Sequence, residues 1–251
     1  MNGARLTAVA ERAGERYGVL LGAFQGILRQ FSSSPNPGSV SVRNRAKSRA
    51  YAYAEGYLET EVELISQAIE QELQNATVDT LHEIGTDYED PSEAIAAHAA
   101  SIGQDLEHAI RTQLERDVSS VGKGLRDLAL RGQLVAKSRG ISTANALALL
   151  RDDVTKGHSF TFQDRASRHW PSQKFIRTLW RHALVLTWNE TAALTMAARG
   201  VPSAVIEHPD TSNNERGTII SLGEETTAIT WDQVRDDVFH PNSNAWLKPV
   251  V

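Results

Sequence analysis

The sequence predicts a mainly α-helical protein with a small α+β module at its C-terminal end. Three observations favour this fold class. Apolar residues recur at spacings of three and four through much of the chain before Gly200, short apolar runs alternate with prolines and Asn-rich turns after it, and the composition is that of an ordinary globular protein, with 41% apolar and 23% charged residues in 251. This length can bury a sizeable core in one or two domains. We therefore expect a long antiparallel helical hairpin followed by a short β-hairpin unit.

The N-terminal segment, residues 1–31, is expected to form a helix over residues 4–30. Its glycines recur every fourth residue, so they would line nearly one helical face; they are Gly14, Gly18, Gly22 and Gly26. Each glycine also costs a helix about 1 kcal/mol relative to alanine. Two interpretations stay open here: a loosely stable terminal helix, or a helix that packs tightly against a partner.

Residues 32–44 have the composition of a linker. The run from Ser32 to Ser39 contains four serines together with Pro35, Pro37 and Gly38. This is the clearest break in the chain.

Residues 45–140 are expected to form an elongated helical hairpin. The first helix covers about residues 45–74, where apolar residues recur at helical spacing and glutamates take the opposite side. The second covers about residues 90–130, with Asp90 as its cap, Pro91 in its first position and Glu93 three residues after the cap. Gly122 and Gly124 are expected to kink or end it.

Residues 141–251 are expected to form the α+β module. Ser142 should cap a short helix that runs to Leu150, residues 157–162 should form a short strand or a loop, and residues 171–199 should form a helix that ends at Gly200. Three short strands are expected after it, over residues 202–207, 217–223 and 228–231.

Composition excludes several classes of chemistry. The chain has no cysteine, which removes disulfides, thiolate nucleophiles, Cys-ligated zinc and iron–sulfur clusters. No apolar run approaches the roughly 18–20 residues of a membrane-spanning helix, so no membrane span is expected, and no signal peptide is expected at the N-terminus. The formal net charge of −5 argues against a protein that binds nucleic acid over its whole surface.

Charge is strongly segregated along the chain. Residues 16–54 carry six basic residues and no acidic one, residues 55–110 carry 14 acidic residues and no Lys or Arg, and residues 111–187 carry 14 basic against 6 acidic residues. Two interpretations stay open: acidic and basic helices pair within one fold, or the charged stretches meet neighbouring chains or nucleic acid. Arg43, Arg45, Lys47 and Arg49 are the candidate nucleic-acid contacts.

Familiar catalytic templates are missing from the sequence. It contains no GxxxxGK[ST], GxGxxG after a strand, HExxH or GxSxG motif. His208, Asp210 and His240 are the residues that a metal-dependent hydrolase or nuclease would use, and this is the alternative function. The competing interpretation is that both His-Pro pairs form turns. For Glu190, a structural hydrogen-bonding role is favoured over a place in a reactive pocket.

The last 75 or so residues follow an order of motifs that points to a family. A helix with Glu190 near its centre ends at Gly200, a strand leads into His208-Pro209-Asp210, a hairpin begins at Gly217, and His240-Pro241-Asn242 closes the chain. This order resembles the C-terminal module of the phage Mu F-like minor head, or head morphogenesis, proteins. In that family the two His-Pro turns are accompanied by pairs of cysteines. Here Ser212 and Asn213, and Ser243 and Ala245, stand near or at those places, so this chain is expected to be a cysteine-less variant that binds no cofactor or metal there.

The resemblance implies a structural protein and not an enzyme. Such a protein would be a minor component of the head of a tailed phage or prophage, bound near the portal inside the capsid, and present in the host cytoplasm during assembly. Its implied partners are the portal protein, the major capsid protein and packaged DNA, with several copies in one virion. Its implied task is head assembly and DNA packaging or ejection.

Overall fold

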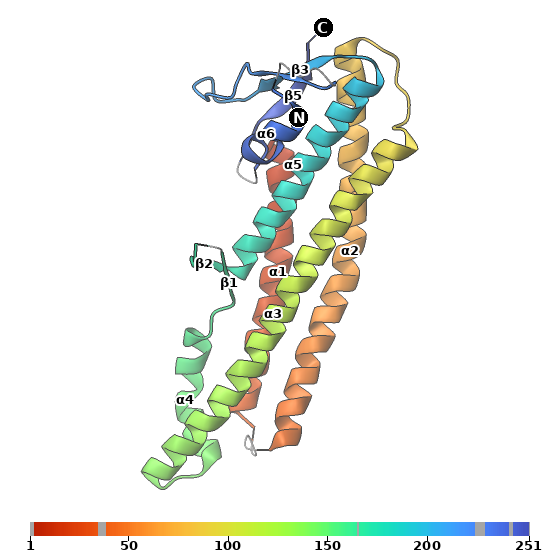
Figure 1. Cartoon of the computed structure of the whole chain (residues 1–251). Helices are drawn as coiled ribbons and strands as arrows, with labels where there is room; N and C mark the ends of the chain where they lie inside the picture. The colour runs from red at the N-terminus through yellow and green to blue at the C-terminus, as the bar shows by residue number, and fades with distance from the viewer. Residues whose placement is uncertain (1–2, 35–38, 165, 224–228, 241–242, 251) are drawn as a thin grey trace. The chain divides into compact units, whose positions relative to one another are not determined.

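A computed structural model shows a mainly helical protein with short strands, which confirms the predicted fold class (Figure 1). The structure describes residues 3–34, 39–164, 166–223, 229–240 and 243–250, with no account of the side chains of residues 151–157 and 236. The described residues form six helices and five strands: α1 (Gly3–Ser32), α2 (Val40–Ile84), α3 (Glu93–Arg139), α4 (Thr143–Gly157), β1 (Thr161–Gln163), β2 (His169–Pro171), α5 (Ser172–Ala198), β3 (Ser203–Glu207), β4 (Ile219–Ser221), α6 (Trp231–Val238) and β5 (Trp246–Pro249). In this part of the chain, no helix is long and apolar enough to cross a membrane.

The chain divides into two compact units, each built from segments that are distant in the sequence. Unit 1 contains residues 1–12, 62–108 and 177–251, and unit 2 contains residues 13–61 and 109–176. Helices α1, α2, α3 and α5 each contribute residues to both units. The domain boundaries expected from the sequence stay predictions.

Helix α1 buries a regular apolar seam and not its glycine strip. The seam follows spacings of three and four, the pattern of a helix with one face in a core. It consists of Leu6, Ala10, Ala13, Tyr17, Leu20, Phe24, Ile27, Leu28 and Phe31, all buried. Around Gly22 and Gly26 a side chain would meet nothing within 4 Å, whereas at Gly18 it would lie 3.0 Å from Gln173. The glycine strip therefore lies beside the packed face, with one close approach within unit 2.

Helix α2 begins near the expected position but ends ten residues later than the sequence pattern indicated. Beyond Gln74 its buried face includes Thr77 and Thr80, whose polar side chains interrupt the apolar period. Thr77 satisfies its hydroxyl by donating to the carbonyl of Leu73 at 2.8 Å. The helix ends at Gly85, whose φ of 79° lets the next residue, Thr86, donate its N–H to the carbonyl of Leu81.

Helix α3 differs from the expectation at both of its predicted irregularities. Ser92, and not Asp90, caps it: the Ser92 hydroxyl accepts the N–H of Ile95, and Glu93 is the first helical residue. The prediction that Gly122 and Gly124 kink or end the helix is wrong, because α3 continues to Arg139. A side chain at Gly124 would lie 3.1 Å from His158 and 3.2 Å from Leu28, so this glycine permits close packing within unit 2.

Unit 2 closes with α4 and a two-stranded sheet. Ser142 caps α4 as predicted, by accepting the N–H of Asn145, although the helix runs past Leu150 to Gly157. The segment expected to be a strand or a loop contributes β1, which pairs antiparallel with β2 so that Phe162 lies opposite Trp170. Phe162 stacks on Phe175 at the start of α5, with ring centres 3.9 Å apart.

The C-terminal sheet of unit 1 has the order β4-β3-β5, all antiparallel. Two of the three expected strands are confirmed as β3 and β4, and α5 ends before Gly200 as predicted. The third expected strand is wrong: of residues 228–231, Ala228 lies outside the described residues, Thr230 makes one isolated bridge to Ser221, and α6 begins at Trp231. Strand β5 instead pairs with β3, with Glu207 opposite Trp246.

Candidate functional site

A buried carboxylate on α5 joins three elements of unit 1. Glu190 is 4% exposed. Its Oε2 accepts the indole N–H of Trp231 at 3.1 Å and lies 3.3 Å from Nε2 of His98, and its Oε1 lies 2.7 Å from Nε of Arg235. His98 comes from α3, and the other two partners come from α6. Glu190 therefore fixes α6 against the helices, and we call these four residues the Glu190 anchor.

The preceding residue fixes the sheet. The Asn189 side chain is fully buried; its Oδ1 accepts the N–H of Leu247 in β5 at 2.9 Å, and its Nδ2 donates to the carbonyl of Val185 at 3.0 Å. Adjacent residues of α5 thus hold α6 and β5 respectively. The sequence analysis singled out Glu190 but missed Asn189 and His98, since their partners lie 58 and 92 residues away along the chain.

The start of α1 joins the same unit through an arginine. Arg181 on α5 donates from Nη2 to Oδ1 of Asn244 at 2.6 Å, and its Nε lies 3.4 Å from the Thr7 hydroxyl. Burial lowers the pKa of Arg181. One arginine therefore connects α1, α5 and the segment that precedes β5.

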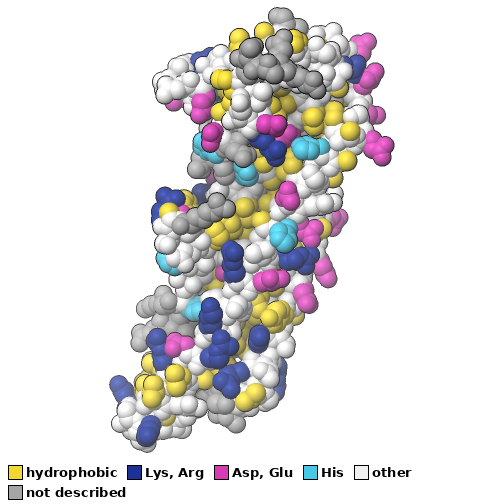
Figure 2. Space-filling view, viewed as in Figure 1, with side chains coloured by type: hydrophobic (Ala, Val, Ile, Leu, Met, Phe, Trp, Pro, Cys, Tyr) yellow, Lys and Arg dark blue, Asp and Glu magenta, His cyan; other side chains and the backbone are white. Residues whose placement is uncertain are grey.

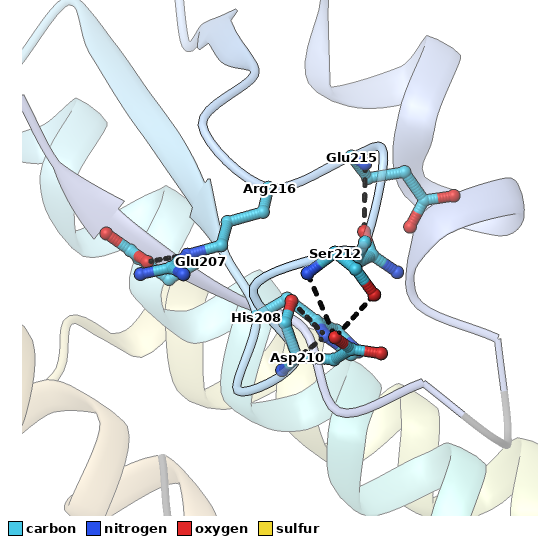
Figure 3. Close-up of polar contacts among 7 residues, drawn as sticks. Glu207, His208, Asp210, Ser212, Glu215 and Arg216 are labelled. Carbon is cyan, nitrogen blue, oxygen red and sulfur yellow. Dashed lines mark hydrogen bonds and ion pairs between the residues drawn. The ribbon is translucent and has the colours of Figure 1, made fainter.

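The first His-Pro pair forms a turn that satisfies its own polar groups (Figure 3). Nδ1 of His208 accepts the N–H of Asp210 at 3.0 Å. Oδ1 of Asp210 accepts the Ser212 N–H at 2.9 Å and the Ser212 hydroxyl at 2.7 Å, and these bonds lower the pKa of Asp210. This arrangement agrees with the interpretation of the pair as a turn former.

Gly217 carries the turn back into β4. Its φ is 84°, a conformation that L-residues with a side chain rarely adopt. From this position its N–H donates to the carbonyl of Ile206 at 2.8 Å, and Glu207 next to that residue lies 3.3 Å from Nε of Arg216 (Figure 3). Gly217 and Pro209 thus flank a loop whose ends are joined by β3 and β4.

The second His-Pro pair is only partly described. His240 is exposed, and its carbonyl accepts the N–H of Ser243 at 2.8 Å. The predicted site residues Pro241 and Asn242 lie outside the described residues. Among the residues that the structure describes, no three His, Asp or Glu side chains form a group able to hold a metal ion, so His208, Asp210 and His240 are not brought together as a ligand set.

Unit 2 contains a second buried polar cluster. Asp117 on α3 is 1% exposed and accepts three hydrogen bonds: from the Tyr17 hydroxyl at 2.6 Å, from the Ser172 hydroxyl at 3.0 Å and from the Gln113 amide at 3.2 Å. Burial raises the pKa of Asp117, and these donors oppose that rise. Nearby, Glu61 is fully buried and pairs with Arg16 through two contacts of 2.9 Å. Both clusters join helices and leave no reactive group open to solvent.

Charge separates between the two units more sharply than along the sequence. Unit 1 contains 8 Lys and Arg against 21 Asp and Glu, a formal charge of −13, and unit 2 contains 18 against 10, a formal charge of +8. On the face drawn in Figure 2, Lys and Arg side chains outnumber acidic ones over unit 2. Such fields steer association with charged partners.

The candidate nucleic-acid contacts lie on the first turns of α2, in unit 2. Arg45, Lys47 and Arg49 are exposed and Arg43 is half-buried. Because helical neighbours are four residues apart, they form two pairs on opposite sides of the helix, Arg43 with Lys47 and Arg45 with Arg49. The Lys47 ammonium lies 5.5 Å from the ring centre of Tyr51, which is 46% exposed. The structure therefore offers cations beside an exposed ring, but no single stripe.

Comparison of the chain with models of protein families, with curated proteins and with solved structures gives no match.

Proposed function

We propose that this protein is a structural minor head protein of a tailed phage or prophage, bound near the portal inside the capsid, where it aids head assembly and DNA packaging or ejection. Its partners are the portal protein, the major capsid protein and packaged DNA. Several copies act in one virion, without cofactor and without catalytic turnover.

One observation carries this proposal: the order of elements in the last 75 residues. Helix α5 with Glu190, the glycine after it, β3, the His208-Pro209-Asp210 turn and the hairpin that begins at Gly217 follow one another as in the Mu F-like module. The Glu190 anchor and Asn189 then tie the closing elements, α6 and β5, back to α5. A module held by buried side chains has no need of the metal that four cysteines would bind.

The charge distribution supports a role in an assembly that contains nucleic acid. Unit 2, at +8, presents exposed cations that can meet phosphates, whereas unit 1, at −13, would repel them. A chain with these two surfaces can touch DNA with one part while another part contacts protein.

No observation favours the hydrolase or nuclease alternative. His208 and Asp210 are engaged in their own turn, and His240 does not join them in a ligand group within the described chain. We therefore do not propose a second function.

The test is the protein inventory of purified particles. Phage or prophage particles are purified, and their proteins are identified by mass spectrometry, with procapsids as a second sample. We expect the chain in both, at a low copy number relative to the major capsid protein, and we expect it to co-purify with the portal protein. Absence from both particles would overturn the proposal.

A matched pair of variants sharpens this test. Glu190→Gln removes the charge that holds α6, and Glu59→Gln makes the same change on an exposed position of α2. We expect the first variant to be depleted from particles and the second to be incorporated normally.

A further inference from the structure

Helix α3 carries an exposed stripe that is both cationic and apolar. Its members are Lys123, Arg126, Leu130, Leu134 and Lys137, at spacings of three and four, so they share one face of the helix. Leu130 is 56% exposed and Leu134 is 60% exposed. Two neighbouring leucines left in water between three cations are typical of a helix that docks into an apolar groove with an acidic rim.

Unit 1 contains a groove of this kind between α2 and α3. Its volume is about 220 Å³, and its floor includes Ile65 and Ile69 of α2 and Ala99 and Gly103 of α3. Gly103 opens it, because a side chain there would lie 3.4 Å from Ile69. Glu70 and Glu107 stand at its rim, in a stretch, residues 55–110, without a single Lys or Arg.

We infer that the cationic stripe of one copy of this chain docks into the acidic-rimmed groove of a second copy. Leu130 and Leu134 would enter the apolar floor, and the stripe's cations would lie beside Glu70 and Glu107. The complementarity extends beyond the contact, since the stripe belongs to a unit of charge +8 and the groove to a unit of charge −13. Complementary fields of this size speed encounter and fix orientation.

The stripe of a copy is not available to its own groove. Both surfaces use α3, which is one unbroken helix from Glu93 to Arg139, so they cannot fold onto each other within a chain. The contact is therefore heterologous: each copy offers a stripe to one neighbour and a groove to another. Repetition of such a contact builds a ring or an open chain of copies. This inference does not rest on the proposed function, because the purified chain alone can test it.

The experiment is sedimentation velocity of the full chain over a range of micromolar concentrations, at about 50 mM and about 500 mM salt, where screening differs severalfold. We expect concentration-dependent association at low salt that weakens at least about tenfold at high salt. Leu130→Gln with Leu134→Gln should abolish association at both salt concentrations. These positions are exposed, so the variant should keep its helical circular dichroism.

A charge swap tests the pairing of the two surfaces. The stripe variant Lys123→Glu, Arg126→Glu and Lys137→Glu, and the groove variant Glu70→Lys and Glu107→Lys, should each be monomeric alone and should associate when mixed. The matched control, Arg45→Glu, Lys47→Glu and Arg49→Glu, makes the same charge change on α2 of unit 2 and should associate like the unmodified chain.

Three results would overturn the inference: a monomer at low salt at the highest concentration reached, stripe variants that associate as the unmodified chain does, or no association of the mixed variants. Binding of a monomeric chain to duplex DNA or to vesicles of anionic lipid, abolished by Leu130→Gln with Leu134→Gln, would also overturn it and assign the stripe to that other partner.

Discussion

The Tyr17 hydroxyl donates a hydrogen bond of 2.6 Å to Oδ2 of Asp117, and both side chains are buried in unit 2. The bond connects α1 with α3, and the Ser172 hydroxyl brings the first residue of α5 to the same carboxylate. Burial raises the pKa of Tyr17 as well as that of Asp117, so the tyrosine keeps its proton and acts only as a donor. Three helices therefore depend on the proton donors around one carboxylate.

Tyr17→Phe should destabilise the protein by about 1.5–3 kcal/mol, the range for a hydrogen bond to a charged group. The ring and its packing remain, and only the donor to Asp117 is removed. The measurement is urea unfolding followed by circular dichroism at neutral pH. Tyr53→Phe is the control, since Tyr53 is 44% exposed and its change should leave the unfolding free energy nearly unchanged. Equal effects of the two variants would contradict the prediction.

Asp117→Asn should reveal the raised pKa of Asp117 through pH dependence. A carboxyl group whose pKa is raised on folding favours the folded state most strongly when protonated, so this contribution is complete below the ordinary pKa near 4 and is lost as pH rises through the raised value. Asparagine does not titrate. The unfolding free energy of the native chain relative to the variant should therefore fall between about pH 4 and pH 7.

Urea unfolding of both chains at several pH values checks this. Because all other groups are shared, their titration cancels in the difference. A difference that rises with pH would mean that the hydrogen bonds outweigh burial and that the pKa of Asp117 is lowered.

Glu190→Gln should loosen α6 without unfolding the helices. The variant keeps an acceptor for Trp231 but loses the charge that faces Arg235 and His98, at a cost of about 2–3 kcal/mol for an ionic contact that is mostly buried. Amide hydrogen exchange should show faster exchange over residues 231–238, while α3 stays protected. Uniform loss of protection along the chain would show that Glu190 supports the whole unit and not the attachment of α6.

Two glycines of α3 should respond oppositely to the same substitution. Gly122→Ala meets nothing within 4 Å and should raise the midpoint of thermal unfolding, through a gain of about 0.5–1 kcal/mol in helix propensity. At Gly132 the new Cβ would lie 2.7 Å from Cγ of Leu147 in α4, and Gly132→Ala should cost about 1–3 kcal/mol. Thermal unfolding followed by circular dichroism compares the two. Stabilisation by both would mean that Leu147 moves aside freely.

The cations of α2 should bind duplex DNA in a salt-dependent manner. Arg45→Glu with Lys47→Glu and Arg49→Glu should weaken binding according to how many phosphates these side chains neutralise, and should flatten the dependence of affinity on salt by up to about 0.9 per phosphate. Fluorescence anisotropy with labelled DNA at several salt concentrations measures both quantities. Glu59→Gln on α2 controls for unrelated changes. Identical salt slopes in the native chain and the triple variant would remove these residues as DNA contacts.

Local patterns predicted the helices well, because each depends on the spacing of its own apolar residues. The end of α2 was missed because Thr77 and Thr80, which are buried, break the apolar period; Gly85 was the available signal. The cap of α3 was assigned to Asp90 because its spacing to Glu93 fits a capping box, whereas Ser92 makes the bond.

Long-range contacts account for the errors in the C-terminal module. Residues 228–231 have the composition of a strand, yet Trp231 begins α6, where its indole reaches Glu190. Strand β5 has no local signal, since its register is set by β3 and its start by the Asn189 side chain. The candidate site was therefore only half visible: Glu190 stood out, while its partners depended on contacts that no single window of sequence contains.

Strand β3 is central in its sheet, and one of its two neighbours, β5, follows about forty residues later, which takes on the order of 2–8 s to translate at about 5–20 residues per second. Throughout that interval, the emerging polypeptide presents an open β edge and a buried-type amide at Asn189 with nothing to bind. Chaperones that shield such edges, and proteases that cut beside them, have their opportunity then. A ribosome that stalls within this stretch leaves a product with complete helices but an unsealed sheet, and quality control in the cell should remove it quickly.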